Sequence, residues 1–200
     1  MTNWMRIALS DCPDQPWANK AGVTRQLLAW PVADPWSLRV SVATISQSGP
    51  YSKLARTRRW HNIVQGSVIL TIDGRKVHLD RLSDPFAFDG GDPCDCELVQ
   101  GPAQAFNIMT RGSFAAKITR IRNRSGSVGE KDALPFSACL DKYALAGVYA
   151  QAPTRIEQND QVIDLQSAQW LWSDTLAPSP GQIRIYSDDA ILVLLEGILK

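Results

Sequence analysis

The side chains with the clearest capacity for binding chemistry are an arginine and a serine in one extended segment. The segment Ser37–Ile45 alternates apolar and polar residues, and Arg39 and Ser41 fall on its polar side. Alternate residues of a β-strand share a face, and a guanidinium can hold a carboxylate through two parallel hydrogen bonds. This spacing is compatible with an anion site on a strand face, although from the spacing alone an inter-strand ion pair on a solvated face is the favoured role for Arg39.

Histidine, a common ligand of transition metals, is scarce in the chain. It occurs as His61 and His78, without a His-x-His pair, and His78 stands among Arg75, Lys76 and Arg81. A mononuclear transition-metal site needs about three imidazoles and a carboxylate. We therefore expect both histidines at the surface or on a rim, no histidine-based metal site and no cofactor, while an ion site made only of oxygen ligands remains open.

Short motifs that carry familiar enzyme mechanisms are also missing from the sequence. It contains no G-x-S-x-G nucleophile elbow, no P-loop and no G-x-G-x-x-G after a predicted strand. The hydrolase, NTPase and dinucleotide-binding sites built on these motifs therefore lack their expected parts. General acid–base chemistry would depend on carboxylates, His61 or a tyrosine, which the sequence alone does not pair.

Charge and hydropathy are those of an ordinary globular protein. The chain has 21 Lys and Arg against 20 Asp and Glu, a formal net charge of +1, and 44% hydrophobic residues. So small a charge gives little of the basic field that nucleic-acid binding needs, and the basic run 56–59 is short. Residues 1–17 lack a continuous apolar stretch, and the apolar tail 190–200 is too short to span a bilayer. We expect a cytoplasmic protein with no nucleic-acid or membrane partner.

The cysteines do not follow a metal or redox pattern. Cys12, Cys94, Cys96 and Cys139 occur without a C-x-x-C pair, and no histidine lies near them in the sequence. Cys94 and Cys96 would share one face of an extended strand. In a reducing compartment we expect reduced thiols rather than disulfides or a zinc site.

Proline and glycine recur at short intervals, and few stretches show the spacing of an amphipathic helix, which predicts many short strands. Asp73-Gly74 between two extended runs is typical of a type I′ hairpin. Together with the segment before Gln65-Gly66, this hairpin predicts a three-stranded meander. Its strands are Trp60–Val64, Ser67–Ile72 and Arg75–Leu79.

Further strand candidates continue to the end of the chain and indicate two domains. The polar, Gly/Ser-rich run 123–132 predicts a linker. It separates an N-terminal domain, 1–122, expected to close into an antiparallel barrel, from a smaller C-terminal β-barrel half, 133–200. The remaining predicted strands lie in Cys96–Val99, Ala105–Thr110, Ala115–Arg122, Phe136–Ala150, Gln169–Ser173, Gln182–Ser187 and Ala190–Leu199.

Five separated segments occur in the order and spacing of one known family. They are Pro16–Arg25, Trp36–Ser41, Gly49–Ser52 continuing to Arg59, Pro85–Gly90 and Phe106–Arg111. On these motifs the chain resembles the HutD/Ves family. The resemblance implies an all-β, cupin-type bicupin with two antiparallel β-barrel or jelly-roll halves, little helix and no metal requirement. It also implies a link to histidine utilisation and binding of a pathway metabolite such as N-formylglutamate.

The sequence departs from the family pattern in two places, which concern the ligand more than the fold. Lys20-Ala21-Gly22 replaces a glycine-rich stretch, and Leu54-Ala55-Arg56 replaces Phe-Pro-Gly before the family arginine, which aligns with Arg59. The predicted ligand-binding residues are Asn19, Thr24, Arg39, Ser41, Ser52, Arg59, Phe88 and Asn107.

Several apolar residues in the motifs are expected to pack rather than bind. Trp17, Trp36 and Met109 are predicted core residues. Phe86 and Phe88 are separated by one residue and therefore share a face, which makes them either core or one apolar wall of the pocket.

The favoured hypothesis is a non-enzymatic protein that binds a small acidic metabolite and has a regulatory role in histidine utilisation or stress response. Arg39 and Arg59 would hold the anion. One alternative is a metal-independent isomerase or epimerase, in which His61 points into the barrel beside a carboxylate. The other is a homodimeric interaction scaffold with a filled interior, which would associate through an exposed strand edge.

Overall fold

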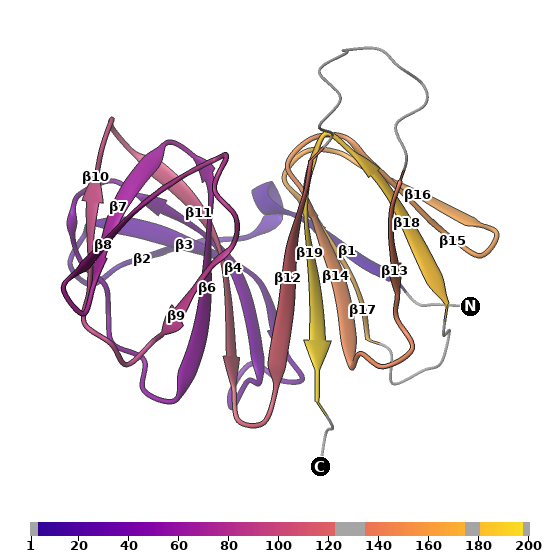
Figure 1. Cartoon of the computed structure of the whole chain (residues 1–200), viewed down its shortest axis with the longest axis horizontal. Helices are drawn as coiled ribbons and strands as arrows, with labels where there is room; N and C mark the ends of the chain where they lie inside the picture. The colour runs from indigo at the N-terminus through magenta and orange to yellow at the C-terminus, as the bar shows by residue number, and fades with distance from the viewer. Residues whose placement is uncertain (1–3, 123–134, 175–180, 198–200) are drawn as a thin grey trace. The chain divides into compact units, whose positions relative to one another are not determined.

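The computed structural model describes residues 4–122, 135–174 and 181–197, and antiparallel strands dominate it (Figure 1). Within these residues the helical structure is one 3-10 turn, η1, Leu9–Asp11. None of the helical structure in the described ranges is long and apolar enough to cross a membrane. The chain divides into two compact units, Cys12–Phe114 and a second made of Met1–Asp11 with Ala115–Lys200. The all-β prediction is confirmed.

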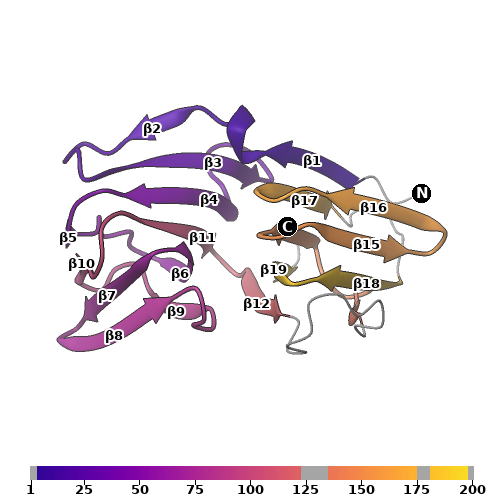
Figure 2. The same ribbon diagram turned by 90° about the horizontal axis from the view of Figure 1, so that it is seen from above.

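The larger sheet of the unit Cys12–Phe114 has six strands in the order β2-β3-β4-β11-β6-β9. Figure 2 shows β2, β3, β4 and β11 following one another across this sheet. The strongest strand prediction, Ser37–Ile45, corresponds to β4. The strands of the sheet are β2 (Asp14–Pro16), β3 (Gly22–Trp30), β4 (Leu38–Ile45), β6 (Thr57–Gln65), β9 (Phe86–Asp89) and β11 (Ala103–Arg111).

A four-stranded sheet, in the order β5-β10-β7-β8, forms the second layer of this unit. Asp73 and Gly74 have φ angles of 47° and 76°, the two positive values that a type I′ turn requires, so the predicted hairpin between β7 and β8 is confirmed. The strands are β5 (Gly49–Pro50), β7 (Ser67–Ile72), β8 (Arg75–Asp80) and β10 (Cys94–Leu98).

The predicted three-stranded meander is wrong, because β6 and β7 belong to different sheets. β6 pairs with β11 and β9, whereas β7 pairs with β10 and β8. The chain changes sheets at Gly66, whose φ is 74°. A Cβ there would lie 2.9 Å from the carbonyl oxygen of Pro102, so glycine is needed both for the backbone conformation and for the close approach.

The core of this unit lies between its two sheets. β7 turns Val68, Leu70 and Ile72 inward at every second residue, and they pack in one buried cluster with residues such as Ile45 and Ile63. Cys94 and Cys96 alternate on β10 and are buried in the same cluster, as their spacing predicted. All four cysteines lie in the described ranges, and none of them forms a disulfide.

The second unit is also built from two antiparallel sheets. Its buried cluster includes Val148, Ile156 and Leu192, which are fully or almost fully enclosed. The five-stranded sheet, in the order β1-β17-β14-β19-β12, has strands Trp4–Ala8, Gln169–Asp174, Leu145–Ala150, Asp189–Glu196 and Ala115–Arg122. The four-stranded sheet, in the order β13-β18-β15-β16, has strands Phe136–Cys139, Gln182–Ser187, Thr154–Gln158 and Gln161–Leu165.

Two parts of the predicted organisation differ from the structure. Each unit is a sandwich of two sheets rather than a closed barrel. The boundaries also differ from the predicted 1–122 and 133–200, because β12 pairs with β19 along its length and β1 pairs with β17. The first and the last strand of the predicted N-terminal domain, β1 and β12, therefore belong to the second unit. The predicted linker, 123–132, lies outside the described residues.

Candidate functional site

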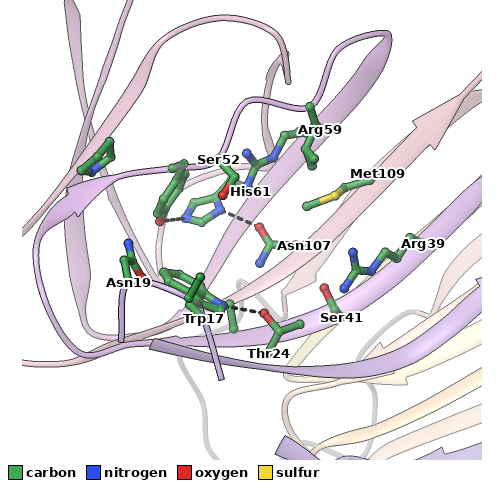
Figure 3. A pocket seen from close by; sticks show the side chains of 15 residues that line it. Trp17, Asn19, Thr24, Arg39, Ser41, Ser52, Arg59, His61, Asn107 and Met109 are labelled. Carbon is green, nitrogen blue, oxygen red and sulfur yellow. Dashed lines mark hydrogen bonds between the residues drawn. The ribbon is translucent and has the colours of Figure 1, made fainter. Parts of the chain in front are cut away.

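Two arginines occupy one row across the centre of the six-stranded sheet. Met109 on β11 is directly opposite Arg39 on β4 and directly opposite Arg59 on β6. Residues that face each other across a ladder project from the same side of a sheet. The two arginines are therefore two strand spacings apart, roughly 10 Å between backbones, with the Met109 side chain between them (Figure 3).

The next row on this face carries neutral polar groups. Asn107 on β11 is opposite Ser41 on β4 and opposite His61 on β6. These residues follow the arginine row by two positions on each strand, which keeps both rows on one face of the sheet. The alternation that defines the strands therefore brings the two arginines and three uncharged polar side chains together.

These rows form one wall of a pocket of about 370 Å³ within the unit Cys12–Phe114. Seven of the eight residues predicted for the site line this pocket, namely Asn19, Thr24, Arg39, Ser41, Ser52, Arg59 and Asn107. The eighth, Phe88, lies opposite Arg59 on β9 and is buried in the core cluster. Its ring centroid is 5.0 Å from the Cζ atom of Arg59. Phe88 therefore packs against a lining residue and does not itself face the cavity.

The guanidinium groups of the pocket have no acidic partner among the residues that the structure describes. The Nε atoms of both Arg39 and Arg59 are buried without a hydrogen bond, and no Asp or Glu lines the cavity. Burial lowers the pKa of Arg59, and burial together with the positive charge of Arg111 lowers the pKa of Arg39. Arginine nevertheless stays charged in proteins. The pocket thus holds two positive charges that no carboxylate in the described part of the chain neutralises.

His61 is deeply buried and lines the pocket, so the prediction of a surface or rim histidine is wrong for this residue. Its Nδ1 atom lies 2.8 Å from Oδ1 of Asn107, whose Nδ2 donates to the carbonyl oxygen of Ala105. Since that amide oxygen accepts, Nδ1 of His61 carries the hydrogen. Burial lowers the pKa of His61 to about 4, so the ring is neutral at pH 7. His78 is exposed, as predicted.

The remaining ring nitrogen of His61 is a hydrogen-bond acceptor. Its Nε2 atom lies 3.5 Å from the hydroxyl oxygen of Tyr51, and burial raises the pKa of that hydroxyl well above 10. The Tyr51 ring is 5.3 Å from Cζ of Arg59 and meets the Trp17 ring edge-on at 6.1 Å. Aromatic groups thus form a second wall that packs against the arginine by cation–π contact.

Sequence reasoning missed four of these lining residues in part or entirely. Tyr51 lies in the motif that contributed Ser52 but was not assigned to the site. Trp17 and Met109 were predicted as core, and both pack as expected while also lining the cavity. His61 was considered only as a catalytic alternative. The alternation of β6 places His61 on the same face as Arg59, and that signal could have identified it.

Two side chains at the pocket wall already accept a hydrogen bond from another protein group. Thr24 accepts a hydrogen bond from Nε1 of Trp17 at 2.8 Å, and Oδ1 of Asn19 accepts one from the backbone of Ala21 at 3.0 Å. Their hydroxyl and amide hydrogens remain available as donors. Together with the hydroxyls of Ser41 and Ser52, they make the cavity rich in donors and poor in negative charge.

The donor set does not fit a divalent metal. His61 is the single imidazole among the lining residues, no carboxylate accompanies it, and two guanidinium groups share the cavity. A transition metal needs several nitrogen, sulfur or carboxylate ligands. In the described ranges, no group of three or more His, Cys, Asp and Glu side chains is arranged to hold a metal.

The fold and the pocket define a cupin-type, all-β protein with an arginine-lined cavity. Oxalate decarboxylase from Bacillus subtilis has a similar fold, with a TM-score of 0.60 and 10% identity over 98% of this chain and 77% of that one. The family model for HutD matches residues 9–183. The chain therefore belongs to the HutD family, which includes Ves proteins and is linked to the histidine-utilisation locus.

Solved structures and sequence relatives agree with this assignment. HutD from Pseudomonas fluorescens superposes with a TM-score of 0.81, 22% identity and coverage of 97% of this chain and 98% of that one. Protein Ves from Cronobacter sakazakii is 27% identical over 58% of this chain and 66% of its own. An uncharacterised 21.2 kDa protein from the hutC 3′ region of Pseudomonas putida is 30% identical over 54% of this chain and 59% of its own. The chain thus spans less than two thirds of these two relatives.

Proposed function

We propose that this pocket binds a small acidic metabolite without transforming it, and that binding regulates histidine utilisation or a stress response. The observation that carries the proposal is a pair of arginines in one cavity, the buried Arg59 and the half-buried Arg39, with no carboxylate among the described residues that line it. Leaving a buried charge without a partner is costly, whereas a carboxylate ligand compensates it with charge-assisted hydrogen bonds. An anion is therefore the ligand that this pocket favours.

The uncharged lining groups support a ligand with further polar functions. Thr24, Asn19, Ser41 and Ser52 offer donors, and the hydroxyl oxygens of Ser41 and Ser52 can also accept. A volume of about 370 Å³ suits a molecule of the size of an amino-acid derivative. N-formylglutamate, the metabolite suggested by the family resemblance, combines carboxylates with a formamide that both donates and accepts.

A thermal-shift series with N-formylglutamate, urocanate, histidine and glutamate tests the proposal. A ligand that binds only the native state stabilises it by RT ln(1+[L]/Kd), about 2.7 kcal/mol at one hundred times Kd. We expect a rise in Tm with at least one acidic ligand. Tm values that stay constant with all four compounds at millimolar concentration would contradict the proposal.

Matched variants separate site binding from general charge effects. Arg39→Gln and Arg59→Gln remove the anion partners and are expected to abolish the ligand-induced shift. Arg58→Gln is the control, because Arg58 is exposed on the opposite face of the same strand as Arg59. Equal shifts in all three variants would place binding elsewhere.

The isomerase or epimerase remains a second candidate because His61 lines the pocket. Its expected carboxylate partner is replaced by the amide of Asn107, and a pKa of about 4 makes the imidazole a weak base. Exchange of a substrate α-hydrogen with D₂O, followed by NMR, would detect this activity. The homodimeric scaffold predicts a filled interior, and the cavity does not favour it.

A further inference from the structure

Arg111 adds a third arginine to this face of the sheet, one row beyond the two arginines of the pocket. It follows Met109 by two positions on β11 and therefore projects from the same face of the sheet as the arginine row. Its direct partner on β6 is Thr57. Arg111 is not among the residues that line the cavity. It is the next residue after Asn107 and Met109 whose side chain projects from this face of β11.

Two contacts position the Arg111 guanidinium, and a third anchors its backbone. Its Cζ atom lies 3.8 Å from the centroid of the Trp36 ring, and Nε donates to Oγ1 of Thr57 at 3.2 Å. The backbone N–H of Arg111 also donates to the carbonyl oxygen of Ser37 at 3.0 Å. Stacking on an aromatic face while one edge is hydrogen-bonded leaves the terminal Nη groups as oriented donors.

Arg111 lies on β11, between the strands that carry Arg39 and Arg59, and is diagonal to both across the two ladders. Arg111 is close enough to lower the pKa of Arg39, and Arg39 in turn lowers the pKa of Arg59. In the described parts of the chain, no carboxylate lies within ion-pair distance of any of the three. Like charges held on one face of a sheet without counter-charge destabilise one another and create a field that attracts anions.

We propose that Arg111 completes a second anion position and that the ligand of this pocket is a dianion. One carboxylate lies between Arg39 and Arg59, inside the cavity, and the second lies between Arg39 and Arg111, at the Trp36 side. This inference rests on the proposed function and narrows its ligand class from an acid to a diacid. Arg111 then acts as a specificity residue, since it distinguishes a second carboxylate from an uncharged group of the same shape.

Isothermal titration of the full chain with matched ligand pairs tests the inference. Succinate, glutarate and adipate are each compared with their monoamides, which replace one carboxylate by a neutral amide of nearly the same size. Wild type is expected to bind at least one diacid about fivefold to tenfold more tightly than its monoamide. Arg111→Gln is expected to reduce this ratio to about twofold or less, while monoamide affinity changes by less than about twofold.

Two further variants distinguish orientation from charge. Thr57→Val keeps the positive charge of Arg111 but removes the acceptor for its Nε, so an intermediate diacid preference is expected. Arg58→Gln on the exposed face is expected to keep the wild-type ratio. Retained monoamide binding also shows that a variant is folded.

The outcomes separate the inference from the proposed function. Equal affinity of wild type for diacids and monoamides, or an unchanged ratio in Arg111→Gln, would overturn the dianion inference. If Arg39→Gln nevertheless abolishes monoamide binding, the anion-binding function stands. Absence of binding to wild type by all six compounds would overturn the dianion inference, and it would overturn the proposed function as well if Tm also stays constant with the four compounds of the thermal-shift series.

Discussion

The Nδ1 atom of His61 lies 2.8 Å from the Oδ1 atom of Asn107, and both side chains are almost fully enclosed. The two residues face each other across the β6–β11 ladder. The amide of Asn107 is oriented by its own hydrogen bond to the Ala105 carbonyl, so it presents oxygen to the imidazole. This contact fixes the tautomer of His61 and holds an uncharged ring beside the charge of Arg59.

This environment predicts a pH-dependent stability. The pKa of His61 is about 4 in the folded state, against 6.5 for a histidine exposed to water, so between these values the unfolded chain binds more protons. The free energy of unfolding therefore falls as pH decreases from about 7 to 4, by on the order of 3 kcal/mol from this group. Urea unfolding at pH 7 and pH 4.5 measures the change.

Two histidine variants identify the group responsible. His61→Gln is expected to lose most of the acid destabilisation between pH 7 and 4.5, although its stability at pH 7 is also lower. His78→Gln, which alters an exposed histidine, is expected to behave as wild type. An imidazole pKa of 6.5 or above for His61, measured by NMR titration, would contradict the assignment.

The second unit offers a comparison between a buried and an exposed ion pair. Nη2 of Arg120 lies 2.8 Å from Oδ2 of Asp189, with side chains 0% and 12% exposed, whereas Nε of Arg155 lies 3.0 Å from Oδ1 of Asp164, with side chains 56% and 61% exposed. Asp189→Asn removes a carboxylate that holds a buried guanidinium through two hydrogen bonds and is expected to cost about 3 to 5 kcal/mol. Asp164→Asn is expected to cost less than about 1 kcal/mol. Similar losses in denaturant unfolding would contradict this reasoning.

Thiol reactivity provides a test of the core that does not depend on the ligand. Cys139 is exposed, whereas Cys12, Cys94 and Cys96 are buried. Burial raises the pKa of Cys94 to about 11, so little thiolate forms near pH 8. We expect one cysteine to react rapidly with a disulfide reagent in the native protein and all four in denaturant. Rapid reaction of Cys94 or Cys96 in the native state, located by mass spectrometry, would show that this sandwich opens.

Local pattern was sufficient to predict most of the strands. The alternation in β4, the Asp73-Gly74 turn and the run that forms β12 all carry their signal within a few residues. Pairing between distant strands has no such signal. The sequence does not reveal that Gly66 directs β7 into the other sheet, or that β12 pairs with β19, because both depend on long-range packing.

The same distinction applies to the pocket. Arg39 and Ser41 could be grouped from their spacing on one strand, and the motif resemblance added five other lining residues. The burial of His61 was not predicted, because its hydrogen-bond partner Asn107, on the neighbouring strand β11, is more than forty positions away in sequence. Tyr51 was missed because it belongs to an irregular segment. In such a segment the strand alternation does not predict on which side a side chain lies.

The row that contains both arginines predicts that a carboxylate introduced by mutation can take the place of the bound anion. Met109 lies directly between Arg39 and Arg59 and is 8% exposed, so Met109→Glu would place a carboxylate at the expected position of the bound anion. Met109→Gln is the isosteric neutral control. The glutamate variant is expected to be more stable than the glutamine variant by about 1 to 3 kcal/mol at pH 7, because its hydrogen bonds to arginine are charge-assisted.

This difference has a definite pH dependence and a functional consequence. The arginines would lower the pKa of the introduced carboxyl group, so the added stability is present above the unfolded-state pKa of about 4.3 and is lost as pH falls through the folded-state value. The glutamate variant is also expected to lose binding of added acids, since its own carboxylate occupies the site. Equal stability of the two variants at pH 7, or wild-type affinity for an acidic ligand in the glutamate variant, would show that the two arginines do not form a common anion site.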